Sequence, residues 1–377
     1  MLRPQVGSPA SRIGMRCADR PDSGVCAPHT GRGDERVTDQ RDRGRVSAPV
    51  SVPVNQGLFG TGLQWPPHSG RSASAITVLV ALGVNVLVAG VKSVVAVVTG
   101  SASLAAEAAH SWADTGNEVF LVVATRRSAR PPDRAHPLGH GREAYVWSLF
   151  AALGLFVTGG AVSIINGVNE VRAPTPAGHF VVGYAVLVIC FVLEAMSLLR
   201  SVQQARPEAQ ALHRDLIEHV LATSDPTLRA VFAEDVAALI GLVVAAVGLA
   251  AHQLTRSATP DAIGSMLIGV LLVVVAVQLI NLNRRFLVGE EADPQVRAAV
   301  LQALLDQPEV ARVTYLRLEV VGPRMIAITG DVDLIGDDSE SHVAVRLRTL
   351  EATISASPAV AGVVLSLSAP DEPTLTA

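Results

Sequence analysis

The chain has 377 residues, of which 49% are hydrophobic, 17% charged and 4% aromatic, with a mean hydropathy of +0.39 and a formal net charge of −4. This composition is typical of an integral membrane protein with soluble parts attached, and it gives no support to nucleic-acid binding. The three cysteines, Cys17, Cys26 and Cys190, form no CxxC motif, which argues against a disulfide framework and against a zinc–cysteine site.

The first 73 residues are rich in Arg, Pro, Gly, Ser and Asp and show no hydrophobic period. We therefore expect residues 1–73 to form a disordered tail. This stretch has no apolar segment of the kind that a secretory signal needs. It also has no organelle-type presequence, so a bacterial plasma membrane is the expected location.

Six apolar segments follow, each close to the roughly 20 residues that cross a bilayer as a helix. An even number of spans would place both termini on the same side of the membrane. The loops after the second and fourth segments are rich in arginine, so the positive-inside rule places these loops and both termini in the cytoplasm. The segments are residues 75–98, 99–124, 144–168, 180–199, 228–251 and 262–282.

Residues 286–370 have a different character and predict a small α+β domain, followed by a short tail at 371–377. Asp293 can cap a helix whose first position is Pro294. Alternating apolar runs on either side of Gly322-Pro323 predict two strands joined by a turn. The expected order is αββαβ, with elements that end near 306, 321, 334, 355 and 367.

The second apolar segment carries four ionisable side chains, Glu107, His110, Asp114 and Glu118. Their spacings of three and four residues place them on one face of a helix. An ionised carboxylate inside a membrane helix costs about 2.5–3.5 kcal/mol, so such residues face a bundle interior or a watery cavity. The imidazole of His110 with the carboxylate of Asp114 is a combination that Zn²⁺ accepts. The alternative is a polar face that only packs against partner helices.

Four runs, together with the C-terminal domain, cover nearly all of residues 74–370 and resemble the cation diffusion facilitator family of divalent-metal transporters. The resemblance implies an α-helical membrane domain of six transmembrane helices at 74–285 and a cytoplasmic αββαβ domain of the ferredoxin or metallochaperone type. It also implies a homodimer that exports Zn²⁺, Mn²⁺, Fe²⁺ or Co²⁺, often in exchange for protons. The runs are residues 85–92, TGSASLAAEAAHSWADTGNE (99–118), HPLGHGREAYVWSLF (136–150) and DAIGSMLIGVLLV (261–273).

In that family the transport site takes two residues from the second span and two from the fifth, each pair four positions apart. His110 and Asp114 match the first pair, and Asp235 matches one position of the second pair. The remaining position falls on Val231, which cannot bind a metal, and this departure puts a four-ligand site in doubt.

Glu234 is the obvious substitute for a ligand at position 231. It lies about 100° around the helix from Asp235, so both reach one cavity only if the helix distorts or the Glu234 side chain bends back. The run DPTLRAVFAEDVAALIG (225–241) resembles the zinc transporter 9 branch of the family, where a Glu-Asp pair occupies this place. That resemblance favours a functional Glu234, and the alternative is that Glu234 only hydrogen-bonds to another helix.

A second constellation, Asp133, His136 and His140, lies in the loop after the second span. Its DxxHxxxH spacing matches a loop-borne metal site of bacterial family members. The alternative is that these residues only shape a tight turn into the third span. In the C-terminal domain His342 is the one histidine, so we expect dimerisation there rather than a strong binuclear zinc site. His213 and His219, between the fourth and fifth spans, predict an amphipathic helix rather than a metal funnel.

The predicted function is divalent-cation efflux with alternating access. Histidine with carboxylates favours Zn²⁺, with Mn²⁺, Fe²⁺ and Co²⁺ as alternatives. Imidazole titrates near neutral pH, so protons can compete with the metal and act as counter-ions. Glu194 in the fourth span is a further candidate to contact the cavity. Because of Val231, a membrane metal-binding or assembly protein that does not transport is the alternative. An enzyme is not expected, since the chain has no nucleotide loop, nucleophile elbow or HExxH motif.

Overall fold

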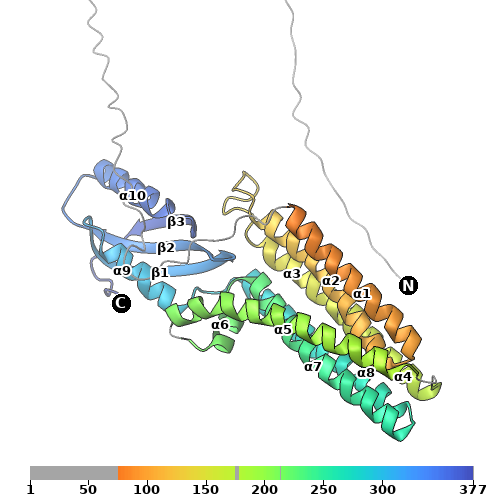
Figure 1. Ribbon diagram of the computed structural model, residues 1–377. Helices are drawn as coiled ribbons and strands as arrows, with labels where there is room; N and C mark the ends of the chain where they lie inside the picture. Colours follow the sequence, from red (N-terminus) through yellow and green to blue (C-terminus); the bar gives the residue numbers. More distant parts are fainter. Residues whose placement is uncertain (1–74, 175–177, 213, 377) are drawn as a thin grey trace, which may run out of the picture. The chain divides into compact units, whose positions relative to one another are not determined.

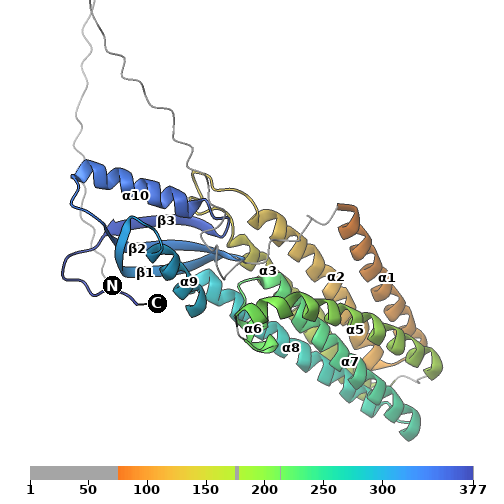
Figure 2. The same ribbon diagram turned by 60° about the vertical axis from the view of Figure 1, so that its left-hand side comes forward.

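The computed structural model describes residues 75–174, 178–212 and 214–376 (Figure 1). The tail predicted at residues 1–73 lies outside the described residues. The membrane part is helical, and Figure 2 shows α2, α5, α7 and α8 running along one another. Its elements are α1 (Ala75–Thr99), α2 (Ala102–Ser128), α3 (Glu143–Gly154), the π-helix η1 (Leu155–Ala161), α4 (Val162–Arg172), α5 (Phe180–Ala211), α6 (Leu216–Ala222), α7 (Pro226–Thr255) and α8 (Thr259–Val288).

Within the described part of the chain, four helices are long and apolar enough to cross a membrane. They are Glu143–Arg172, Phe180–Ala211, Pro226–Thr255 and Thr259–Val288. In α1, the apolar stretch found at Asn85–Thr99 is shorter. The helix α2 is long but not apolar enough, because ionisable side chains interrupt it.

Ser101 fixes the start of α2. Its backbone is extended, and its hydroxyl accepts a hydrogen bond from the amide of Leu104, which otherwise has no partner at a helix N-terminus. The hydroxyl also bonds the buried carboxylate of Asp261, near the start of α8, at 3.0 Å. The turn between α1 and α2 is thereby tied to the turn between α7 and α8.

The predicted third span is a continuous rod with a π-helical segment, η1, at its centre. At this point it approaches α8 through glycines. A Cβ at Gly160 would lie 2.7 Å from Cγ2 of Val273, and one at Gly269 would lie 2.8 Å from the carbonyl oxygen of Gly160. Small residues let two membrane helices approach closely. Through this close contact α8 packs against the third span as well as against α2.

The fourth span is longer than predicted. We expected the helix to end near residue 199, but α5 continues to Ala211 and passes through Pro207. A proline inside a helix removes one backbone hydrogen bond, but buried Ala205 packs here with Val220 and Leu228 in a small apolar cluster. The amphipathic helix predicted after this span is short: His219 lies on α6, whereas His213 lies outside the described residues.

The C-terminal domain has the predicted order αββαβ, formed by α9 (Pro294–Leu305), β1 (Val310–Gly322), β2 (Met325–Leu334), α10 (Glu340–Ser355) and β3 (Val360–Leu367). The strand order is β1-β2-β3, with β1 and β2 antiparallel and β2 and β3 parallel (Figure 1). As expected, the Asp293 carboxylate caps α9 by accepting from the amide of Gln295. Residues of both helices join the sheet in one apolar core, among them Val300, Leu318 and Ile354.

The tail predicted at 371–377 is held against the sheet as far as it is described. The amide of Leu375 donates to the carbonyl of Val313 at 2.8 Å. The carboxylate of Glu372 accepts from the hydroxyl of Thr314 at 2.8 Å. These contacts extend the edge formed by β1.

Candidate metal sites

A cavity of about 450 Å³ lies among α1, α2, α5 and α7. Side chains of α2 and α7 that the sequence singled out line it, and so does Glu194 of α5. Such a set of acidic groups inside membrane helices is costly without a cation or protons to neutralise it. The five carboxylate residues that line the cavity are Asp114, Glu118, Glu194, Glu234 and Asp235.

Glu234 and Asp235 both face this cavity, although α7 is a continuous α-helix from Pro226 to Thr255. Their carboxylates lean toward different neighbours. Glu234 accepts from the side-chain amide of Asn117 on α2, whereas Asp235 accepts from the hydroxyls of Ser197 and Ser201 on α5, each at 3.1 Å. Because the cavity lies between α2 and α5, the 100° offset between the two residues needs no distortion of the helix.

Val231 lines the same cavity. The position at which the family pattern has a ligand is therefore in the expected place, but an apolar side chain occupies it. Valine has no atom that can bind a metal, as the sequence indicated. Glu234 is the carboxylate residue nearest to position 231 along the helix.

His110 is not among the residues that line the cavity. Its side chain is 1% exposed, and Nδ1 lies 3.5 Å from Oδ1 of Asp114. Neither ring nitrogen has a hydrogen-bond partner among the described residues. The imidazole thus lies one helical turn before Asp114 in α2, and its unprotonated ring nitrogen is available to bind a metal ion. In this conformation the predicted residues of α2 and α7 do not bring three ligand atoms within 4.8 Å of one another.

Sequence reasoning missed three side chains of this region. Asn117, Ser197 and Ser201 hold the carboxylates of α7, yet nothing in their spacing distinguished them from ordinary polar residues of a helix face. Glu107, which the sequence singled out, pairs instead with Lys92 of α1, with Nζ 3.3 Å from Oε2, and neither residue lines the cavity. The signal for Lys92 was its place in an otherwise apolar segment.

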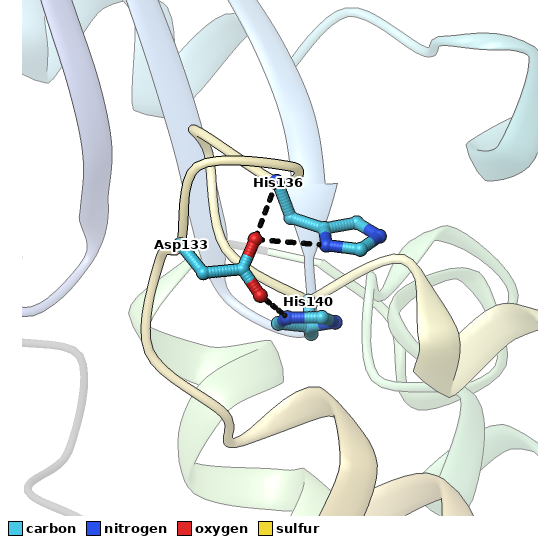
Figure 3. A group of neighbouring side chains, drawn as sticks. All are labelled: Asp133, His136 and His140. Carbon is cyan, nitrogen blue, oxygen red and sulfur yellow. Dashed lines mark hydrogen bonds and ion pairs between the residues drawn. The ribbon is translucent and has the colours of Figure 1, made fainter.

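The loop between α2 and α3 brings together Asp133, His136 and His140 (Figure 3). The Asp133 Oδ1 atom lies 3.1 Å from Nδ1 of His136, and its Oδ2 atom lies 3.1 Å from Nε2 of His140. The centroids of the two imidazole rings are 4.1 Å apart. Within the described ranges, these three residues form the one group of His, Cys, Asp or Glu whose ligand atoms all lie within 4.8 Å.

Backbone geometry explains why the loop adopts this shape. The Asp133 carboxylate accepts from the amides of Ala135 and His136 at 2.8 and 2.7 Å, which closes a tight turn. Gly139 has a φ of 78°, in the left-handed region that favours glycine. Gly141 touches β1, since a Cβ there would lie 2.6 Å from the carbonyl oxygen of Val321. The residues that shape the turn are therefore the same residues that form the cluster.

The electrostatics of the loop favour an ionised carboxylate. Hydrogen bonds from His140 and from the backbone and side chain of His136 hold the pKa of Asp133 well below its usual value of 3.8. Asp133 and His136 are half-exposed, whereas the His140 side chain is 9% exposed. An anionic oxygen with one exposed and one largely buried imidazole forms a donor set that Zn²⁺ accepts, and the exposed side leaves room for water as a further ligand.

The family model for the cation efflux transmembrane domain matches residues 78–288. Metal tolerance protein C4 of Arabidopsis thaliana is 34% identical over 269 residues, which are 71% of this chain and 58% of that protein. The human proton-coupled zinc antiporter SLC30A9, mitochondrial, is 30% identical over 259 residues, which are 69% of this chain and 46% of that protein.

The magnetosome protein MamM of Magnetospirillum gryphiswaldense is 30% identical over 114 residues, which are 29% of this chain and 35% of that protein. The matched region thus spans about half the length of the plant and human relatives, at 58% and 46%. The family model, in contrast, covers more than half of this chain and includes every helix that lines the cavity. The chain belongs to the cation efflux family, the cation diffusion facilitators that its sequence resembles.

Proposed function

We propose that this chain exports a divalent cation, with Zn²⁺ as the favoured cargo, in exchange for protons. The observation that carries the proposal is the cavity between α2, α5 and α7, which gathers carboxylates of three membrane helices. Relatives that match the same region include proteins named proton-coupled zinc antiporters. Mn²⁺, Fe²⁺ and Co²⁺ remain candidate cargoes because the groups that face the cavity are mostly oxygen donors.

In this proposal Asp114, Glu234 and Asp235 bind the cation together with His110, whose Nδ1 adjoins Asp114. A cation neutralises carboxylates that are otherwise expensive to keep ionised in a low-dielectric site. When the cation leaves, protons take its place on the same groups, and this exchange couples the two flows. The ligand atoms are spread around the cavity here and must converge when the cation binds, which suits a site that alternates between access to the two sides.

We further propose that α1 and α2 cross the membrane with the four more apolar spans, giving six in all. The arginine-rich segments after α2 and along the end of α5 then lie in the cytoplasm together with both termini. A polar face on α2 is compatible with crossing because the other helices surround it. The C-terminal domain, of metallochaperone type, would join two copies in a homodimer, and the bacterial plasma membrane is the proposed location.

The loop residues Asp133, His136 and His140 are proposed as a second Zn²⁺ site at the cytoplasmic surface. The support is their mutual distance and the ionised state of Asp133. This site is separate from the cavity, and Gly141 within the same loop contacts β1. Metal bound here would therefore rigidify the approach of the C-terminal sheet to the membrane helices.

The test is metal uptake into proteoliposomes that carry a proton gradient, with Zn²⁺ and Mn²⁺ assayed in parallel. We expect flux for the wild type and loss of at least tenfold for Asp114→Ala, Asp235→Ala and Glu234→Ala. Retained flux in Glu234→Ala alone would leave Glu234 as an interhelical partner only.

The position of Val231 favours one competing function, a membrane metal-binding or assembly protein that no longer transports. A correctly folded wild type that binds Zn²⁺ but moves none under a proton gradient would select this alternative.

Proton coupling is tested by a separate measurement. The metal flux should fall when the proton gradient is collapsed with an ionophore while the total metal concentration is unchanged.

A further inference from the structure

We propose that Asn117 is a positioning residue that holds the Glu234 carboxylate over the cavity, in place of the ligand missing at position 231. The inference rests on the proposed function, because it concerns the same metal site. It explains how Glu234, which is offset by about 100° from Asp235 around α7, can serve a site that Asp235 and Val231 also line.

The position of Asn117 fits this role. It lies three residues after Asp114 on α2, so the two side chains share one face of the helix. Its side-chain amide nitrogen donates hydrogen bonds to both oxygens of the Glu234 carboxylate. Because a carboxylate only accepts hydrogen bonds, the amide must present its N–H group to Glu234. This contact draws Glu234 toward α2, the helix that carries Asp114.

The other end of the Asn117 amide points to the same conclusion. The residue is 2% exposed, yet its Oδ1 atom has no hydrogen-bond partner within the described part of the chain. Most buried side-chain polar atoms have a hydrogen-bond partner, so an amide oxygen without one is an exception that calls for an explanation. Among the residues that the structure describes, the hydrogen bond to Glu234 is the one interaction that orients the amide, and Asn117 lines the cavity beside the carboxylate it holds.

A second amide–carboxylate pair gives the chain its own control. Asn85 of α1 donates to the carboxylate of Glu118 at 2.7 Å, and the pair borders the same cavity. Glu118 is outside the proposed set of ligands. The two asparagines therefore differ in which carboxylate they hold, and removal of Asn85 should not alter the preference for one metal over another.

The experiment measures Zn²⁺ affinity of the purified full chain in detergent, in a His136→Ala/His140→Ala background that removes the loop ligands. We expect Asn117→Leu to weaken Zn²⁺ binding at least tenfold, and Asn85→Leu to leave the ratio of Zn²⁺ to Mn²⁺ affinity within about twofold of the background. Adding Val231→His to Asn117→Leu restores a ligand at the missing position, so affinity should return to within about threefold of the background.

Background affinity in Asn117→Leu would overturn the inference. So would a folded Asn117→Leu/Val231→His protein that stays weak, since Asn117 would then matter for structure only. If Asn117→Leu does not assemble, Asn117→Ser removes the same contact with a smaller side chain and carries the same expectations. A background protein that binds Zn²⁺ tightly but transports none would defeat the proposed function and leave the binding result to decide the role of Asn117.

Discussion

At the scale of single residues, the buried ion pair between Lys92 and Glu107 shows how strongly the membrane part depends on charge compensation. Their side chains are 1% and 0% exposed, and Oε1 of Glu107 has no hydrogen-bond partner among the described residues. A Cβ at Gly241 on α7 would lie 2.4 Å from that same oxygen. The carboxylate is therefore enclosed by α1, α2 and α7, and it relies on Lys92 for compensation.

Removing one partner of this pair should destabilise the protein strongly. We expect Lys92→Met to lower the free energy of unfolding by about 3–5 kcal/mol, because it leaves an uncompensated carboxylate in the interior. The double variant Lys92→Met/Glu107→Leu should recover most of that loss, since apolar residues can replace a buried pair. Thermal unfolding in detergent measures both, and equal stability of the single and double variants would contradict the argument.

The loop site gives a prediction about pH. Because hydrogen bonds from His140 and His136 lower the pKa of Asp133 below 3.8, the carboxylate is ionised, and its contribution to the loop complete, at any pH well above that value. The contribution is lost only as the pH falls through the lowered pKa. We expect the amide proton shifts of Ala135 and His136 in NMR spectra to show no Asp133 titration between pH 8 and pH 5.

A titration of both amides within that range that persists in His136→Ala/His140→Ala would show instead that the carboxylate is protonated there, because neither imidazole that lies against Asp133 is then present. Asp133→Asn is the matched variant, because it keeps the shape of the side chain but removes its charge. We expect it to weaken Zn²⁺ binding at the loop about tenfold, measured with the cavity ligand Asp235 replaced by Ala.

At the scale of elements, glycines decide how closely the third span approaches α8. A Cβ at Gly167 on α4 would lie 2.6 Å from the carbonyl oxygen of Ala262, whereas nothing lies within 4 Å of the corresponding position at Gly154 on α3. Both glycines are helical and lie in the same span, so they separate the effect of interhelical contact from that of helix propensity.

We expect Gly167→Ala to lower the melting temperature by several degrees, because the backbone of α8 must move to admit the methyl group. Gly154→Ala should be neutral or stabilising by up to about 1 kcal/mol, since alanine is the better helix former. The melting temperatures of the two variants, measured side by side by thermal unfolding, test this expectation. Equal destabilisation of both would show that packing against α8 does not limit this position.

At the scale of the whole molecule, the proposed topology predicts which surfaces face each side of the membrane. In a background with Cys17, Cys26 and Cys190 replaced by Ser, single cysteines can be placed at the exposed positions Arg130, Ser257 and Asp371. We expect Ser257→Cys to react with an impermeant maleimide in intact cells.

Arg130→Cys and Asp371→Cys should react only after the cells are permeabilised, because six spans place both positions in the cytoplasm. Labelling of Asp371→Cys from outside would require an even number of spans between Ser257 and that position, or an inverted protein. Opposite behaviour of Arg130→Cys and Asp371→Cys would exclude an even number of spans between them.

The sequence by itself determined the elements and the chemistry. Hydrophobic runs, the Asp293 cap and the turn predicted at Gly322-Pro323 were local signals, and they placed the helices and the αββαβ order. The turn itself lies one residue later, at Pro323-Arg324, because Gly322 still pairs with Met325 at the end of β1. The spacing of His110 and Asp114 and the DxxHxxxH loop identified the ionisable groups to examine. The extension of α5 through Pro207 was missed, because a packing contact to α6 and α7 outweighs the local preference.

Only the tertiary structure decided which of these groups meet. The position of the Glu234 carboxylate depends on the residue of α2 that contacts it. That residue is Asn117, which lies 117 positions away in the chain. The same holds for Asp235, which α5 holds through Ser197 and Ser201. Helical period fixes directions around one axis, but contacts between helices depend on the rotation and depth of each, which no single segment encodes.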